Sequence, residues 1–146
     1  MDGFDGLRDI RHALPAEARR LIVERVAKAA SDAGGVAAVF LHGSFAGDAP
    51  FRDIDLAVLP CRGIPDAGRK AVTDALETAA APYDVDLRWL DEAPTHFAYR
   101  VIAEGRVVWE SDPTARADFV EQALIEHFDT AWMRAELLRG ALGLDR

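Results

Sequence analysis

The chain has 146 residues, of which 50% are hydrophobic and 29% are charged, and its formal net charge is −8. This length fits one domain over 1–146 with a substantial core, and no apolar run approaches the ~20 residues that a membrane-spanning helix needs. The acidic balance, with no basic stripe, argues against a surface that holds DNA or RNA, because phosphate contacts dominate such binding.

Cys61 is the single cysteine, which excludes an intrachain disulfide. The first residues lack the basic-then-apolar layout of a signal peptide. We therefore expect a cytoplasmic protein without a membrane partner. Any polyanionic ligand must be small and metal-bridged, or else the partner is another protein.

The first half of the chain is predicted to form two helices followed by two strands. A short helix is expected over 7–14 and a stronger one over 16–30, where apolar residues recur at helical spacing and charged residues such as Arg19 and Arg20 lie mostly opposite. Gly34 and Gly35 end that helix. Short apolar runs over 36–42 and 53–59 predict two strands, the second closed by Pro60.

The second half alternates helices with strands. Pro65 opens a helix that Pro82 stops, and the strict alternation over 83–90 predicts a strand with Asp84, Asp86 and Arg88 on one face. A helix over 94–104, a short strand over 106–109 and a long helix from Asp112-Pro113 to about residue 138 follow. The order predicts an α+β domain, close to α/β, with a small mixed sheet flanked by helices and a long C-terminal helix.

The stretch 41–59 carries the predicted chemistry. Asp53 and Asp55 are two residues apart on a strand, so their carboxylates share a face, roughly 6–7 Å apart at the backbone. Two neighbouring anions repel each other unless a cation lies between them, and Mg²⁺ prefers oxygen ligands. Gly43-Ser44 follows an apolar run, where a turn can aim backbone N–H groups at a phosphate. Together these features predict phosphoryl or nucleotidyl transfer.

Gly43-Ser44, then Asp53-Ile54-Asp55, then Asp86 on a later strand resembles the DNA polymerase β-like nucleotidyltransferase superfamily. More narrowly, the chain resembles the minimal nucleotidyltransferases (MNT), the antitoxin partners of HEPN-domain toxins. The segments that carry this resemblance are GSFAGDAPFRDIDLAV, VDLRWLDEAP and VIAEGRVVWESD.

The resemblance implies a polymerase β-type fold in which Asp53, Asp55 and Asp86 are catalytic and hold two Mg²⁺ ions, while Gly43 and Ser44 bind the triphosphate of ATP. It also implies that AMP passes from ATP to a tyrosine hydroxyl of a cognate HEPN ribonuclease toxin, in a hetero-oligomer of the two proteins. Asp86 is also placed to accept the proton of the attacking hydroxyl. Asp84, on the same face, is the alternative to Asp86, and Ser44 is alternatively only a helix N-cap.

One departure concerns the loop after Gly43-Ser44. Only eight residues, 45–52, separate it from Asp53, and Gly47-Asp48 stand where the family has an Arg-Gly pair. Arg52 and Arg88 are the candidates for the missing positive charge. The departure leaves two rival functions open: neutralisation of the toxin by binding alone, and transfer of a nucleotide to a small molecule.

The last helix carries more apolar side chains than one packing stripe needs. A bent helix that buries them within its own domain is one interpretation. The other is that 113–143 binds a partner protein, as an antitoxin would. The stripe and the residues that widen it are Phe119, Val120, Ala123, Leu124, Phe128, Ala131, Met133, Ala135, Leu137, Leu138 and Leu142.

Overall fold

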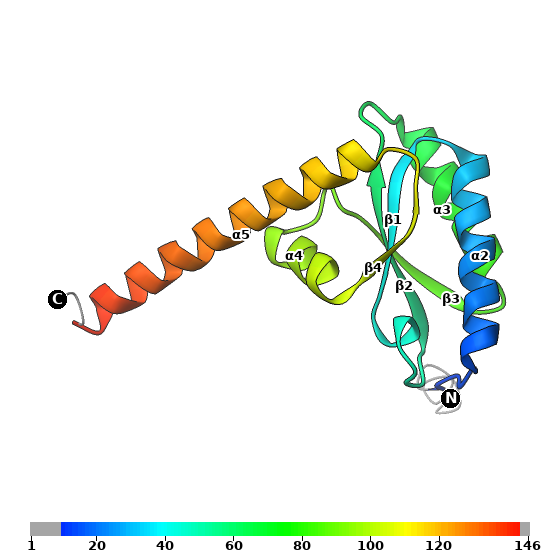
Figure 1. Ribbon diagram of the computed structural model, residues 1–146, viewed down its shortest axis with the longest axis horizontal. Helices are drawn as coiled ribbons and strands as arrows, with labels where there is room; N and C mark the ends of the chain where they lie inside the picture. The colour runs from blue at the N-terminus through cyan, green and yellow to red at the C-terminus, as the bar shows by residue number, and fades with distance from the viewer. Residues whose placement is uncertain (1–9, 144–146) are drawn as a thin grey trace, which may run out of the picture.

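The computed structural model describes residues 10–143. One four-stranded mixed sheet, in the order β3-β2-β1-β4, lies at its centre (Figure 1). β1 pairs antiparallel with β2 and β4, whereas β2 and β3 run parallel. The strands are β1 (Val36–His42), β2 (Asp53–Pro60), β3 (Asp84–Trp89) and β4 (Arg106–Glu110). The predicted α+β architecture with a small mixed sheet is therefore confirmed.

Helices cover the two faces of the sheet unequally. α2 (Ala16–Ala33) and α3 (Asp66–Ala80) pack side by side on one face, which we call the closed face. α4 (Thr95–Glu104) and the first turns of α5 (Pro113–Ala141) cover part of the other, the open face (Figure 1). Strand alternation sends Ile54, Leu56 and Val58 of β2 into the closed-face core, so the remaining side chains of β2 face the opposite side.

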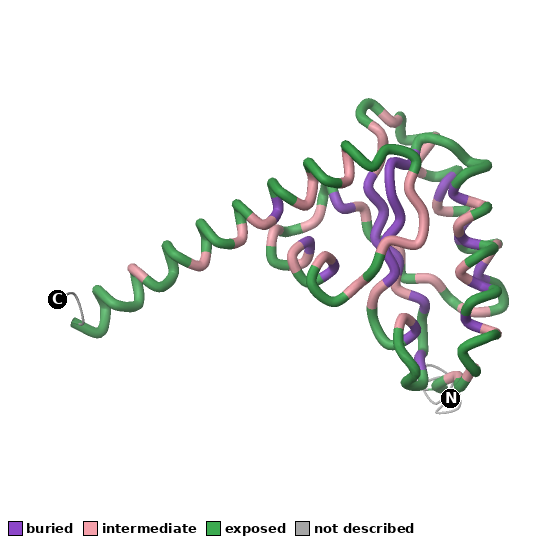
Figure 2. Tube along the Cα trace, viewed as in Figure 1, coloured by how far each residue is buried: buried purple, intermediate pink, exposed green. Residues whose placement is uncertain are grey.

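α5 leaves the domain after its first turns and projects away from the sheet (Figures 1 and 2). Asp112 caps its start by accepting a hydrogen bond from the backbone N–H of Ala115 at 3.0 Å, as the sequence predicts. Ala123 is the one buried residue of this 29-residue helix. The interpretation in which α5 buries its apolar surplus within its own domain is therefore wrong. The exposed apolar surface of α5 comprises Ile125, Phe128, Trp132, Met133, Leu137, Leu138 and Leu142.

Two local expectations are corrected near the N-terminus. Residues 10–14 are not helical: His12 forms an isolated bridge with Phe51, which ties this segment to the loop before β2. The rest of the helix expected over 7–14 lies outside the described residues. Arg19, expected on the solvent side of α2, is 6% exposed. No helix within residues 10–143 is long and apolar enough to span a lipid bilayer.

Candidate active site

Strand register brings the predicted carboxylates together on the open face. β2 and β3 are parallel, with Asp53 opposite Asp84 and Asp55 opposite Asp86. Residues directly opposite on neighbouring strands point to the same side of a sheet, so all four acids share one face. Asp86 adjoins Asp55, whereas its alternative Asp84 adjoins Asp53 at the exposed start of the two strands.

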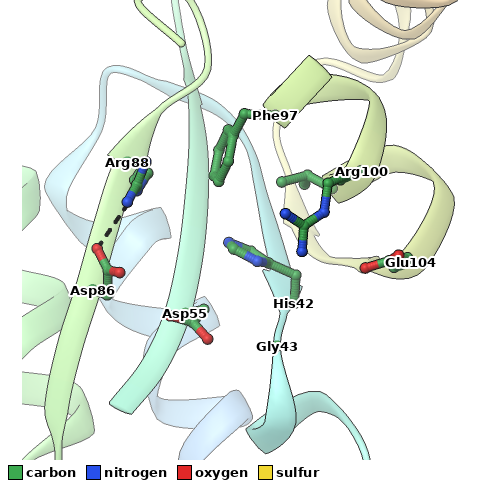
Figure 3. A pocket seen from close by; sticks show the side chains of 9 residues that line it. His42, Gly43, Asp55, Asp86, Arg88, Phe97, Arg100 and Glu104 are labelled. Carbon is green, nitrogen blue, oxygen red and sulfur yellow. Dashed lines mark ion pairs between the residues drawn. The ribbon is translucent and has the colours of Figure 1, made fainter. Parts of the chain in front are cut away.

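Asp55 is the electrostatic centre of this group. The carboxyl of Asp55 is half-buried, and its pKa is raised to about 6. Burial is the largest cause, and the negative charges of Asp86 and Asp53 follow. Arg88 opposes this shift only in part; its Nε lies 3.8 Å from Oδ1 of Asp86 (Figure 3). The face therefore holds more negative charge than its own cations neutralise.

Gly43 allows the turn after β1 to approach Asp55 closely. Its φ of 75° lies in the left-handed region, and a Cβ at this position would stand 1.9 Å from Oδ2 of Asp55. Only glycine fits here without moving the carboxylate. Gly43 is the N-cap of a 3₁₀ turn, η1 (Ser44–Ala46). Ser44 is the first residue of that turn, and the N-cap role considered for it is wrong.

A cavity of about 200 Å³ opens between these strands and α4 (Figure 3). Gly43, Asp55 and Asp86 line it, whereas Ser44 and Asp53 are exposed and lie outside its lining. Arg88, one of the two candidates for the missing loop charge, also lines it, and Arg52 does not. The complete lining is His42, Gly43, Asp55, Asp86, Arg88, Phe97, Arg100, Val101 and Glu104.

Sequence reasoning missed the contribution of α4 to this cavity. Phe97 packs under the guanidinium of Arg88, 4.9 Å from ring centroid to Cζ, and meets His42 edge-on. Burial lowers the pKa of His42, and its Nε2 is buried without a hydrogen-bond partner. No local motif marks Phe97 and Arg100, because they reach the site only through the crossing of α4 over the sheet.

Sequence reasoning also missed Arg19. Its guanidinium lies under the loop between Gly43 and Phe51 and donates hydrogen bonds to carbonyl oxygens of that loop, among them Gly47 and Ala49, both at 2.9 Å. An arginine beside a long apolar stripe is normally read as solvent-facing. Its burial gives the loop a cation that comes from α2 rather than from the loop itself.

Comparison with known families shows the family to which the chain belongs. Residues 24–114, which include both strands of acids and the Gly43-Ser44 turn, match the polymerase beta nucleotidyltransferase family. The chain belongs to this family. No curated protein matches the chain.

Solved structures support the same nucleotidyltransferase fold. The chain matches a structure of a tri-AMPylated Shewanella oneidensis HEPN toxin in complex with MNT antitoxin, with 22% identity, a TM-score of 0.64, and coverage of 85% of this chain and 98% of that one. It also matches a toxin–antitoxin structure with AMP-PNP, at 22% identity, a TM-score of 0.65, and coverage of 82% and 98%. The MntA–HepT toxin–antitoxin structure matches at 21% identity, a TM-score of 0.62, and coverage of 84% and 98%. At this identity the likeness establishes the fold.

The donor set of this candidate site fits a divalent cation. Within residues 10–143, no group of three acidic, histidine or cysteine side chains is arranged to hold a metal ion. Oδ1 of Asp86 lies instead 3.8 Å from Nε of Arg88. The carboxylates of Asp53, Asp55 and Asp86 are nevertheless neighbours on one face. After burial, the charges of Asp86 and Asp53 are the next causes that raise the pKa of Asp55. A cation among them would relieve their repulsion, and oxygen-only ligands suit Mg²⁺.

Proposed function

We propose that this chain is an MNT-type antitoxin that transfers AMP from ATP to a tyrosine hydroxyl of a cognate HEPN ribonuclease toxin and thereby silences it. The observation that carries the proposal is the gathering of Asp53, Asp55 and Asp86 on one face of the sheet, with Gly43 directly against Asp55. Family membership supports nucleotidyl transfer. A structure of similar fold contains an AMPylated HEPN toxin, which supports the choice of group and acceptor.

In the proposed reaction, the tyrosine oxygen attacks the α-phosphorus of ATP. A new O–P bond forms, the bond to the bridging oxygen breaks, and pyrophosphate leaves. Asp86 accepts the hydroxyl proton, while Gly43 and Ser44 hold the triphosphate through backbone N–H groups. Asp53, Asp55 and Asp86 would hold two Mg²⁺ ions, which supply charge neutralisation for the attacking and leaving oxygens.

The partner surface in this proposal is the exposed apolar surface of α5. Its largest side chain, Trp132, is 66% exposed, and Leu137 is 73% exposed. Monomeric proteins rarely expose a contiguous apolar surface along several helical turns, and aromatic residues dominate binding at protein interfaces. Structures of similar fold are toxin–antitoxin complexes, which supports a HEPN toxin as the occupant.

The test is to incubate the purified chain with the toxin, ATP and Mg²⁺ and to measure the mass of the toxin. We expect a gain of one or more AMP groups. Asp55→Asn and Asp86→Asn should each slow the transfer by about 100-fold or more, because each removes charge from the reacting site. Asp84→Asn is the matched control, since Asp84 shares the face but lies beside Asp53. An unmodified toxin would contradict the proposal, and equal loss in Asp84→Asn would contradict the choice of Asp86.

A second candidate function is neutralisation by binding alone. Asp48 in the loop and the outward apolar surface of α5 favour it, because an acid weakens triphosphate binding while the helix still offers a docking face. Under this alternative, Asp55→Asn neutralises the toxin as well as the wild type does. Under the enzymatic proposal, the same variant binds the toxin but leaves its ribonuclease active.

A further inference from the structure

Arg19 is an unusual residue for its surroundings. Among residues 10–143, it is the one polar or charged residue that is buried. Within the described residues its hydrogen-bond acceptors are all main-chain carbonyls rather than carboxylates, and five of them belong to the loop that follows Gly43. The acceptor oxygens and their distances are Leu14 at 2.8 Å, Ser44 at 3.3 Å, Phe45 at 3.2 Å, Gly47 at 2.9 Å, Asp48 at 3.3 Å and Ala49 at 2.9 Å.

Packing holds the guanidinium in place beneath the loop. Its Cζ lies 5.6 Å from the ring centroid of Phe45 and 5.1 Å from that of Phe51, and both rings are fully buried. Burying a charge without a carboxylate partner is costly. An apolar side chain of similar length would fill the same space, so the guanidinium contributes something other than volume: it fixes where the loop carbonyls point.

This bonding pattern also determines where the loop N–H groups point. In a trans peptide the N–H of each residue lies antiparallel to the preceding carbonyl. The carbonyls of residues 44, 45, 47 and 48 point at Arg19. The N–H groups that follow them, those of Phe45, Ala46, Asp48 and Ala49, therefore point away from Arg19. Ala46 uses its N–H within the turn, bonding to Gly43 at 3.2 Å. The guanidinium thus orients the loop as a whole, and it adds a positive charge below Asp48.

We infer that Arg19 is the positioning residue for nucleotide binding: from helix α2 it sets the conformation of the loop 43–51, the task that the absent loop arginine leaves open. The loop has no lysine or arginine of its own. The inference rests on the proposed function, because it assigns this loop to the triphosphate. It adds Arg19 to Arg52 and Arg88 as a source of positive charge near the loop.

The test compares Arg19→Lys and Arg19→Gln with the matched control Arg20→Gln. Lysine keeps the charge and the aliphatic stem but lacks the planar fork that reaches several carbonyls at once. Arg20 is the next residue of the same helix, is exposed, and pairs with Glu17 and Glu24. Two quantities are measured: KM for ATP and kcat in the AMP-transfer assay, and amide hydrogen exchange of peptides covering 43–51 in the nucleotide-free protein.

We expect Arg19→Lys to raise KM for ATP tenfold or more while kcat stays within threefold, and to speed exchange in 43–51 but not in β3. Arg20→Gln should match the wild type in both. Arg19→Lys with wild-type KM and wild-type exchange overturns the inference. So does a loss of affinity that comes with an equal loss of helix signal in circular dichroism, because that result gives Arg19 a folding role.

The two proposals fail in different ways. A wild-type chain that transfers AMP normally, with Arg19 variants that do the same, overturns only the role of Arg19. A wild-type chain that neither binds ATP nor modifies the toxin overturns the proposed function. In that case unchanged exchange in 43–51 would overturn the loop-positioning role as well, and faster exchange would leave that role standing without its link to ATP. Should Arg19→Gln fail to fold, Arg19→Lys decides.

Discussion

The two faces of the sheet differ in what they bury. On the closed face, large apolar side chains from β1 and β2 meet α2 and α3, and residues such as Leu41, Ile54 and Leu76 are at most 1% exposed. On the open face, the strands present small residues such as Ala38 and Ala57 under α4 and α5, and the acids Asp55 and Asp86 occupy the part that leads to the cavity. Strand β2 contributes to both faces through alternation alone.

A single strand therefore carries residues that stabilise the fold on one face and candidate catalytic residues on the other. The closed face has the density of a protein core, so truncation there leaves cavities. The open face holds uncompensated charge and an orphaned polar atom, features that cost stability and occur at functional sites. Substitutions on the closed face should therefore destabilise the fold, whereas some on the open face should stabilise it and abolish activity.

The largest effect is expected from Leu56→Ala on the closed face. Leu56 is 1% exposed and packs in the core between the sheet and α2 and α3, so its truncation should lower the free energy of unfolding by about 2–5 kcal/mol. Urea unfolding followed by circular dichroism measures the change. Leu21→Ala is the matched control, because Leu21 of α2 is 50% exposed and should cost no more than about 0.5 kcal/mol. Equal losses in both variants would contradict the assignment of the closed face as the core.

Asp55→Asn on the open face is expected to raise the free energy of unfolding instead of lowering it. The folded protein raises the pKa of Asp55 from 3.8 to about 6, so it holds the ionised carboxyl less favourably than the unfolded chain does. The full shift corresponds to ~3 kcal/mol, and screening at a half-exposed group reduces this to about 1–2 kcal/mol. Without divalent cations, Asp55→Asn should raise the free energy of unfolding by that amount at pH 8.

The pH dependence of this gain follows from linkage. Below pH 3.8 the carboxyl is protonated in both states, so asparagine brings no advantage; the wild type then loses stability as the pH rises through about 6. Urea unfolding at pH 8 and pH 4 should therefore show a gain that disappears at the lower pH. Mg²⁺ should stabilise the wild type and not the variant. A gain that is equal at both pH values would contradict the electrostatic cause.

Local rules predicted most of the elements in this molecule. Gly34 ends α2, Pro65 precedes α3, and Asp112 caps α5, each for a reason that lies within a few residues of sequence. Alternation over 83–90 predicted that Asp86 and Arg88 share a face, and the parallel register with β2 confirms that this face is also that of Asp55. The placement of the predicted acids together was thus foreseeable from strand periodicity and from the family resemblance.

What depended on long-range contact was not foreseeable. Helical spacing put Arg19 among the solvent-facing residues, and five of its six carbonyl partners lie 25 to 30 positions later in a loop whose path no local pattern specifies. Phe97 and Arg100 reach the cavity only because α4 crosses the open face, which follows from β3 and β4 lying at opposite edges of the sheet. The chain order of strands does not reveal that arrangement.

A smaller stabilisation is expected from His42→Phe. The Nε2 of His42 is buried without a partner, and a ring of similar shape removes that unsatisfied atom, which should raise the free energy of unfolding by about 1 kcal/mol at pH 7.5. Burial lowers the pKa of His42 below 6.5 in the folded state, so the wild type loses stability as the pH falls below 6.5 and the unfolded chain takes up the proton. The gain should therefore grow at pH 5.5, measured by urea unfolding. A destabilised variant would mean that Nε2 has a partner in solution.

The smallest effect on the isolated chain is expected from Trp132→Ala on α5. Trp132 is 66% exposed and lies nine residues after Ala123, the one buried residue of α5, so the free energy of unfolding should change by no more than about 0.5 kcal/mol. The affinity for the proposed HEPN toxin, measured by titration calorimetry, should nevertheless fall tenfold or more, because tryptophan is among the residues that most often carry binding energy at interfaces. Glu121→Ala, at an exposed charged position of the same helix, is the control for both measurements. A large loss of stability would show that α5 packs against its own domain in solution. Unchanged affinity would place the proposed toxin on another surface. Trp132 therefore distinguishes a helix that completes the fold from one that extends it toward a partner.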